Sequence, residues 1–209
     1  MMTSSTGDRT RMRSRRRCLA PGFSLMEMMI VVALFSITII IMAQTFSSFN
    51  QLHRKIANKA IVNQDLRFVM EMLIRATRTH AISYATEPSG SRETELRLET
   101  LDGQIMIFKQ SALGDALCND LTTVRCLLLS TDSGTTWVPV SGKRVNVTRF
   151  DTYVRPTHSP FVLGGSGVYD NNTQPFVTFN IEMTYMADRT QERSSLQAQS
   201  TVSSRVYKR

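Results

Sequence analysis

The sequence contains no glycine or proline between Gly22 and Pro88, so it lacks the two residues that most often break a helix over this whole stretch. A single helix can therefore run from about Phe23 to Ser83. At 1.5 Å per residue it would be roughly 90 Å long, about three times the thickness of a bilayer's hydrocarbon core. Its first third is apolar on all sides, and beyond Gln44 apolar residues recur at three- and four-residue steps. We predict that the first third lies in a membrane and that the remainder packs on a folded head.

Histidine and cysteine are scarce, with three of each in 209 residues. His53 and His80 fall on the predicted helix without a paired carboxylate or cysteine, and His158 stands alone. Cys118 and Cys126 have no histidine nearby in the sequence and cannot supply the four ligands of a zinc site. The sequence also lacks a Ser/His/Asp arrangement, a phosphate-binding loop and metal-ligand spacing. We therefore predict no catalytic residue, no cofactor and no metal site.

An apolar run from Phe23 to Ala43 is long enough to span a bilayer, because a helix needs roughly 20 such residues. The run carries one carboxylate, Glu27, although an ionised side chain inside hydrocarbon costs about 2.5–3.5 kcal/mol. Gly22 stands immediately before the run, and a basic tract at residues 13–17 precedes it. A carboxylate at such a place persists when it has a partner or a task, so Glu27 is a candidate functional residue.

The order of these features, a basic leader, Gly22, Phe23 and then Glu27 at the fifth position of an apolar helix, resembles the leader of type IV prepilins and type II secretion pseudopilins. The resemblance implies that a prepilin peptidase cleaves between Gly22 and Phe23 on the cytoplasmic face and that the new Phe23 amine is N-methylated. It also implies that the partners are other pilin or minor pilin subunits. The stretch Leu73–Arg78 resembles, more loosely, the helix end of larger minor pilins and J-type pseudopilins.

Glu27 has a physical role in such an assembly. If the helices pack side by side with an axial stagger, its carboxylate can meet the Phe23 amine of a neighbouring subunit. Attraction between opposite charges in a low-dielectric surround favours that register. Two alternatives are a plain single-pass anchor, in which Glu27 reaches the lipid headgroups, and a secretory signal peptide cut after Ala43. The signal peptide fits poorly, because its apolar region is normally about 7–15 residues long and uncharged.

The charge of the chain is concentrated in the leader. Six arginines against one aspartate give residues 1–22 a net charge of +5, out of +8 for the whole chain. These arginines keep the N-terminus cytoplasmic by the positive-inside rule, so the high isoelectric point is weak evidence for nucleic-acid binding. We predict a single pass through the inner membrane with a periplasmic head before assembly. After assembly the protein would lie in a pilus or pseudopilus, which can reach the cell surface.

The predicted fold class is α+β, with the long helix packed on a mostly antiparallel β-sheet head. The predicted segments are a cleaved leader (1–22), a transmembrane and assembly helix (23–43), an amphipathic continuation of that helix (44–87) and a β-rich head (88–209). Two alternating runs flank Asp102-Gly103, a strong hairpin signal. A second alternating run spans Val177–Tyr185, and a closing strand is expected over Leu196–Tyr207.

Cysteine usage agrees with export of the head. Cys18 lies in the leader and is lost on cleavage, which leaves Cys118 and Cys126 as an even pair in the exported part. An oxidising compartment would let them form a disulfide that closes a short loop. Two free buried thiols are the alternative.

One short motif could suggest an enzyme. Residues Ser130–Trp137 match the Asp-box pattern Ser-x-Asp-x-Gly-x-Thr-Trp, known from sialidase-type propellers, where it recurs once per blade. A single copy predicts only a well-formed hairpin. In it Asp132 would accept backbone N–H bonds, Gly134 would adopt a positive φ and Trp137 would pack over the strands.

Two further groups are candidate ligand sites. Oxygens that could bind calcium occur at Asp151, Asp170, Asn171 and Asn172, although ordinary polar turns explain them as well. A basic-aromatic strip that could contact DNA comprises Lys143, Arg144, Arg149 and Arg155, interleaved with Phe150 and Tyr153. Solvated strand faces also produce such strips.

The function predicted from the sequence is structural: a minor pilin or pseudopilin of a type IV pilus or type II secretion-like fibre, and not an enzyme. The first alternative is a DNA-uptake minor pilin that binds DNA through the basic-aromatic strip. The second is a membrane-anchored surface enzyme, which a cleft with convergent acidic groups near the Asp-box hairpin would favour.

Overall fold

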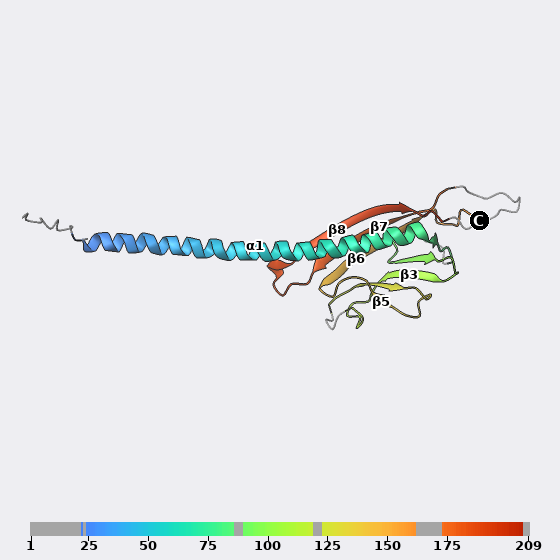
Figure 1. Cartoon of the computed structure of the whole chain (residues 1–209), viewed down its shortest axis with the longest axis horizontal. Coiled ribbons are helices and arrows are strands. Elements are labelled where there is room, and N and C mark those ends of the chain that lie inside the picture. The colour runs from blue at the N-terminus through green and yellow to red at the C-terminus, as the bar shows by residue number, and fades with distance from the viewer. Residues whose placement is uncertain (1–21, 23, 86–89, 119–122, 162–172, 207–209) are drawn as a thin grey trace, which may run out of the picture. The chain divides into compact units, whose positions relative to one another are not determined.

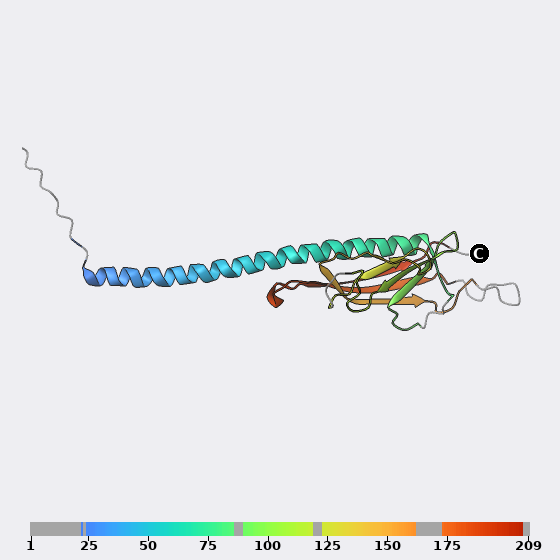
Figure 2. The ribbon, with the colours of Figure 1, turned by 90° about the horizontal axis from the view of Figure 1, so that it is seen from below.

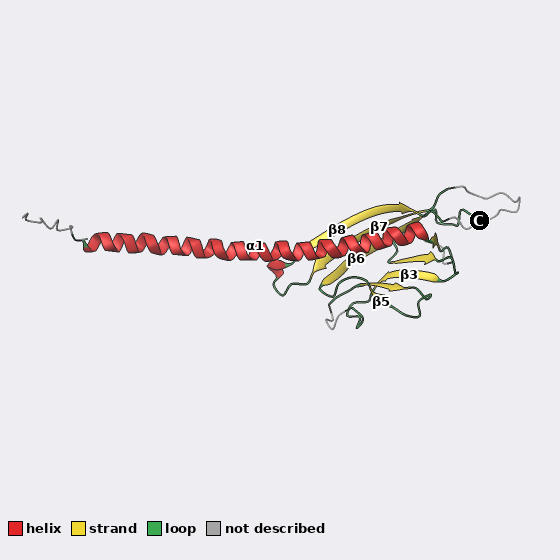
Figure 3. Ribbon diagram, viewed as in Figure 1, coloured by secondary structure: helices red, strands yellow, loops and turns green. Residues whose placement is uncertain are grey.

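A computed structural model of the chain describes residues 22, 24–85, 90–118, 123–161 and 173–206. These residues form one long helix, α1 (Leu25–Thr79), followed by eight strands and a short 3-10 helix (Figures 1 and 3). Contacts divide the chain into two compact units, residues 1–47 and 48–209. The predicted α+β class is therefore confirmed. The helix residues from Ser48 onward belong to the same unit as the strands.

The part of α1 in the first unit is apolar and exposed along its length. In the part of the chain that the structure describes, α1 is the one helix whose length and composition would let it cross a membrane. The hydroxyls of Ser36, Thr38 and Thr45 each donate to the carbonyl four residues earlier, at distances of 2.8–2.9 Å. Each of these hydroxyls therefore finds its hydrogen-bond acceptor within the helix. A polar side chain in hydrocarbon needs such an acceptor, either in its own helix or in a neighbour.

The part of α1 in the second unit buries one face. Apolar residues at three- and four-residue steps turn this face toward the strands, as the sequence predicted; they are Val62, Leu66, Val69, Met70, Leu73 and Ala76. Figure 2 shows α1 lying against one side of the strands. Side chains of α1 and of both sheets form a single hydrophobic core.

The helix ends at Thr79 and not at the predicted Ser83, and residues Ala81–Ile82 form strand β1. The last turn is closed by the Thr79 hydroxyl, which donates to the carbonyl of Arg75 at 2.9 Å. Beyond it, Ala81 and Ile82 pair with β2 and are both buried. Pairing with β2 and burial therefore stabilise Ala81 and Ile82 more than continuation of the helix would, although no glycine or proline ends the helix there. The predicted helical segment 44–87 is wrong over its last residues.

A polar contact also links α1 to the strands. Asp65 on α1 accepts a hydrogen bond from the backbone N–H of Gly142, and burial raises the pKa of the Asp65 carboxyl above its usual value. A Cβ at Gly142 would collide with that carboxylate, so the close approach requires glycine at this position.

Five strands form the first sheet, an antiparallel meander in chain order. They are β1 (Ala81–Ile82), β2 (Glu95–Glu99), β3 (Ile105–Gln110), β4 (Leu127–Ser130) and β5 (Val138–Pro139). The predicted turn joins β2 to β3, with Gly103 at φ 79° and its N–H donating to the carbonyl of Thr100 at 3.0 Å. This hairpin is as predicted.

Three strands form the second sheet in the antiparallel order β6-β7-β8. They are β6 (Val145–Arg155), β7 (Phe176–Tyr185) and β8 (Ser195–Ser203), with the 3-10 helix η1 (Thr190–Glu192) between the last two. The predicted alternation on β7 is confirmed, because its core-facing residues are fully buried: Val177, Phe179, Ile181 and Met183. The predicted closing strand begins one residue earlier and ends at Ser203, and Tyr207 lies outside the described residues.

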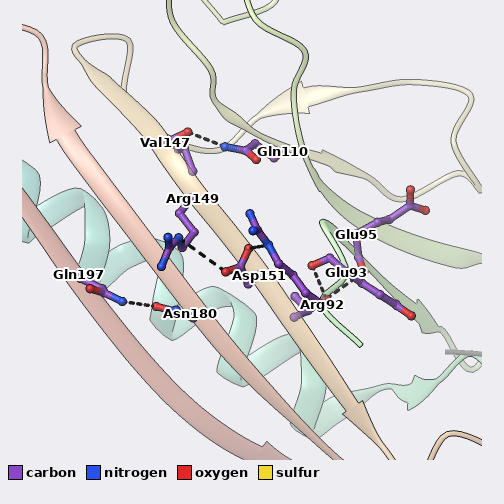
Figure 4. Close-up of polar contacts among 10 residues, drawn as sticks. Arg92, Glu93, Glu95, Gln110, Val147, Arg149, Asp151, Asn180 and Gln197 are labelled. Carbon is purple, nitrogen blue, oxygen red and sulfur yellow. Dashed lines mark hydrogen bonds and ion pairs between the residues drawn. The ribbon is translucent and has the colours of Figure 1, made fainter. Parts of the chain in front are cut away.

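The two sheets meet along β6 (Figure 4). Gln110 of β3 donates its side-chain N–H to the carbonyl of Val147 at 2.7 Å. Glu93 and Thr152 exchange backbone hydrogen bonds of 3.1 and 2.8 Å. Asp151, which is 3% exposed, forms an ion pair with Arg92 across this junction and a second one with Arg149 on its own strand. The contacts of Gln110, Glu93 and Arg92 join residues far apart in the sequence, so together they hold one sheet against the other.

The predicted disulfide is present. Cys118 and Cys126 are bonded, and both are buried with Leu128 and Trp137 in a small second cluster. This bond ties the connection between β3 and β4 back to the start of β4.

We predict that the double variant Cys118→Ser/Cys126→Ser unfolds more easily than the wild type. Closing a loop of this length limits the unfolded chain, and its loss should lower the free energy of unfolding by about 2–3 kcal/mol. Denaturant unfolding can be followed through Trp137, the chain's one tryptophan. Cys18→Ser is the matched control and should leave stability unchanged. Equal stability of the double variant and the wild type would contradict the prediction.

Candidate functional site

The start of α1 is the first candidate site. Ser24 caps the helix, because the backbone N–H of Glu27 donates to its Oγ at 3.2 Å and to its carbonyl at 3.1 Å. Glu27 is the acidic residue of the first turn and is exposed. Gly22 is exposed and has no atom near the position of a Cβ. Phe23, the predicted cleavage and methylation residue, lies outside the described residues.

Sequence reasoning missed the cap, although its signal is present. Ser24 and Glu27 have the Ser-x-x-Glu spacing of a capping box, in which the first residue satisfies an orphan N–H of the helix start. A carboxylate in the first turn also faces the positive end of the helix dipole. Glu27 thus stands at a position that favours a negative charge even before a partner subunit is considered. Among the described residues the Glu27 carboxylate has no ion-pair partner.

The Asp-box hairpin is the second candidate. Both carboxylate oxygens of Asp132 are engaged within the turn: Oδ1 accepts from Ser130 Oγ at 2.7 Å and from the Thr136 N–H at 2.9 Å, and Oδ2 accepts from Thr136 Oγ1 at 2.6 Å. These bonds lower the pKa of Asp132 to about 2. Ser133 and Gly134 adopt positive φ values of 57° and 94°. The expected Asp132 and Gly134 geometry is confirmed.

Trp137 is held at the base of this hairpin. It packs against the disulfide cluster, and Lys109 Nζ lies 3.6 Å from the centroid of its ring, a cation–π contact. Since Asp132 is committed to its own turn and Trp137 to its neighbours, the hairpin has the contacts of a structural element. Among the described residues no group of three or more histidines, cysteines, aspartates or glutamates could hold a metal ion.

One aromatic member of the basic-aromatic strip proposed for DNA, Phe150, is not on the surface. Phe150 is fully buried in the core and cannot stack on a base. Lys143 and Arg144 precede β6, whereas Arg155 ends it and donates to the Gly90 carbonyl at 3.1 Å. Arg149 lies between them in the sequence, and its Nε is 3.7 Å from Asp151 Oδ2. The four cations are therefore distributed from the residues before β6 to its last residue. The predicted interleaving with Phe150 is wrong, because alternation along a strand turns that side chain inward.

Of the calcium candidates, Asp151 is the one that the structure describes. Asp151 lies on strand β6 and not on a loop. It forms ion pairs with Arg92 and Arg149 (Figure 4), and the positive charges of these arginines would repel a cation. Asp170, Asn171 and Asn172 lie outside the described residues.

A cavity of about 320 Å³ lies beside β1, lined in part by Ser83, Tyr84, Glu99 and Phe161. The Tyr84 hydroxyl is buried without a hydrogen-bond partner among the described residues, and burial raises its pKa to about 12. This phenol stays protonated at neutral pH and can act as a donor, not as a base.

No family model, curated protein or solved structure matches this chain. By its fold the protein belongs to the α+β class, and its long helix begins with an apolar segment that could span a membrane.

We predict that acid opens the Asp132 hairpin in a narrow pH range. The pKa of Asp132 in the folded chain, about 2, is below its ordinary value of 3.8. Its contribution to stability is therefore complete above about pH 4 and is lost as the pH falls through about 2. Trp137 fluorescence should change over this range in the wild type.

The variant Asp132→Asn should already show the altered Trp137 emission at neutral pH and should lack the acid transition. Asp102→Asn, at the exposed turn between β2 and β3, is the matched control and should retain it. An acid transition of unchanged size in Asp132→Asn would contradict the assignment.

Proposed function

We propose that this chain is a minor pilin or pseudopilin, an assembly subunit of a type IV pilus or type II secretion-like fibre. One observation carries the proposal: Glu27 lies in the first turn of a membrane-compatible helix that continues without a break into the core of an α+β head. A plain anchor has no need of a carboxylate there. A cleaved signal peptide has no need of a helix that continues into the head.

The proposed maturation follows from the residues before α1. A prepilin peptidase would cut the Gly22–Phe23 bond on the cytoplasmic face and remove the leader with its net charge of +5. The new Phe23 amine, once methylated, would stand one residue before the Ser24 cap. The exposed position of Gly22 supports access to this bond.

The proposed assembly step is the meeting of two charges. The Phe23 amine of one subunit and the Glu27 carboxylate of the next are each costly to bury alone in hydrocarbon, and pairing offsets much of that cost. Because the pair forms at one axial stagger, it sets the register between neighbouring helices. Glu27 would thus recruit and position a neighbour and would not act as a catalyst.

We predict that the mature protein begins at N-methyl-Phe23, which intact-mass analysis of the membrane fraction would reveal. Gly22→Val should block processing yet leave the fold unchanged, because no atom lies within 4 Å of a Cβ at Gly22. Ala20→Val, two residues upstream, is the matched control and should still be cut. A mature chain that starts at Gln44, or an uncut wild type in peptidase-competent cells, would exclude the proposal.

We predict that Glu27→Gln reduces co-purification with partner pilins by about tenfold or more, which corresponds to 1.4 kcal/mol of lost interaction. Glutamine keeps the size of the side chain and also serves the third position of a capping box, so the variant removes only the charge. Total membrane abundance should be unchanged, or higher, since a buried charge is removed.

Ser24→Ala separates the cap from the charge. It should weaken the helix start by about 1 kcal/mol and still assemble, because Glu27 remains. Normal assembly of Glu27→Gln would mean that Glu27 is only a tolerated polar residue, and the plain anchor would then be the better interpretation.

A further inference from the structure

The outer edge of β8 is free in the described part of the chain. β8 (Ser195–Ser203) is the last strand of the second sheet, with β7 on one side and no strand on the other (Figure 1). Exposed edges are normally protected by charges, prolines, bulges or short length. β8 has nine residues, Ser-Leu-Gln-Ala-Gln-Ser-Thr-Val-Ser, without charge, proline or glycine. Its pairing with β7 is continuous over all nine.

The hydrogen bonds at its two ends show which backbone groups face outward. The Ser204 N–H donates to Pro175, and the Ser194 carbonyl accepts from Tyr185, so both of these even-numbered residues bond toward β7. In an antiparallel strand alternate residues bond to opposite sides. The odd-numbered residues from Ser195 to Ser203 therefore direct their N–H and C=O groups to the free edge.

The side chains on the polar face do not fold over this edge. Gln197 donates to Asn180 of β7 at 2.8 Å (Figure 4), and the hydroxyls of Thr201 and Thr178 are 2.9 Å apart. Both side chains are thus engaged on the β7 side of the strand. In the described part of the chain, no strand pairs with the outward backbone groups between them.

The core beneath the second sheet is less complete along the first half of β8. On β7 the inward residues Phe179 and Ile181 are fully buried, whereas on β8 Val202 is buried but Leu196 and Ala198 are only partly buried against the same core. One more strand beside β8 would cover these two side chains. Backbone groups and apolar surface are therefore unpartnered at the same margin.

We propose that the free edge of β8 is a docking site for an extended strand of a different subunit, which would run antiparallel to β8 and extend the second sheet. The site extends the proposed assembly role by naming the surface on which a neighbouring subunit docks. Since β8 alternates small apolar and uncharged polar residues, the incoming strand should carry the same alternation.

A second copy fits the edge chemically but not in orientation. If two β8 strands paired antiparallel with Gln199 at the centre, chemically similar residues would face each other, with Leu196 opposite Val202 and Gln197 opposite Thr201. Two copies paired in this way would run in opposite directions. Hydrogen bonds join Asn58 to Glu192 and His80 to Ser204, so within the second unit α1 runs in the same direction as β8. The α1 helices of two copies would therefore also be opposed, whereas helices that enter a membrane from one side run the same way. A free peptide has no such restriction, so residues 195–203 provide a suitable probe.

The experiment measures binding of a fluorescent, end-capped 195–203 peptide to the full-length protein in detergent. We expect saturable binding to the wild type and protection of the odd-numbered amides of β8 from hydrogen exchange. Gln199→Pro removes an outward N–H without losing a bond to β7, and should weaken binding by about tenfold or more. Gln199→Thr retains the N–H and is the matched control.

Two measurements keep the test independent of folding. Unfolding followed at Trp137 reports whether Gln199→Pro is intact, and a peptide N-methylated at its central glutamine should fail to bind the unchanged wild-type protein. Absence of saturable binding, or equal binding of the methylated peptide, would overturn the proposal. A wild-type dimer that Gln199→Pro dissociates would overturn the choice of occupant and assign a second copy. None of these results depends on Glu27 or on cleavage at Gly22, so failure here and failure of the proposed function are distinguishable.

Discussion

The packing of one face of α1 on the two sheets is the interaction on which the rest of the head depends. Val62, Val69 and Leu73 are fully buried, and they share one core with side chains from both sheets. Burial of each such side chain is worth about 1.5–3 kcal/mol relative to exposure. Without this face of α1, the inward side of the second sheet would stand open to water. The same helix begins with a segment that is long and apolar enough to cross a membrane.

Polar contacts as well as the apolar core stabilise the arrangement of α1 and the two sheets. Asp151 is almost fully buried, yet its charge is matched by Arg92 from outside its own sheet and by Arg149 on its own strand. A buried carboxylate without such partners would be strongly unfavourable. Asp65 makes the corresponding contact between α1 and the backbone at Gly142. Since the Arg92–Asp151 and Asp65–Gly142 contacts join separate parts of the fold, they help to specify how α1 and the sheets fit together.

The opposite margins of the second sheet differ in how they are covered. β6 is covered by the first sheet through Gln110 and Glu93, whereas β8 has no such cover among the described residues. The sheet is therefore closed on one side and open on the other. An open, uncharged strand edge can pair with another chain, which leads to aggregation in a free protein and provides a binding surface in a subunit that has neighbours.

Local patterns in the sequence determined several elements by themselves. The glycine- and proline-free stretch predicted the helix, Asp102-Gly103 predicted the β2–β3 hairpin, and alternation predicted β7. The Asp-box geometry also followed, because its hydrogen bonds join residues at most four apart. The Ser24 cap was equally local and could have been read from its spacing with Glu27. The pairing of Cys118 with Cys126 followed from their even count and from the prediction that the head is exported.

Tertiary structure alone decided the features that depend on distant partners. The helix ends at Thr79 because Ala81 and Ile82 find β2, and no residue near them in the sequence signals this. The candidate DNA strip is divided because Phe150 faces the core, and Asp151 is excluded as a calcium ligand because arginines reach it. Whether a strand edge is covered or free depends in the same way on what the fold brings beside it. Local sequence sets the period and the turns, whereas pairing between remote segments is chosen by the burial and the hydrogen bonds that the whole fold makes available.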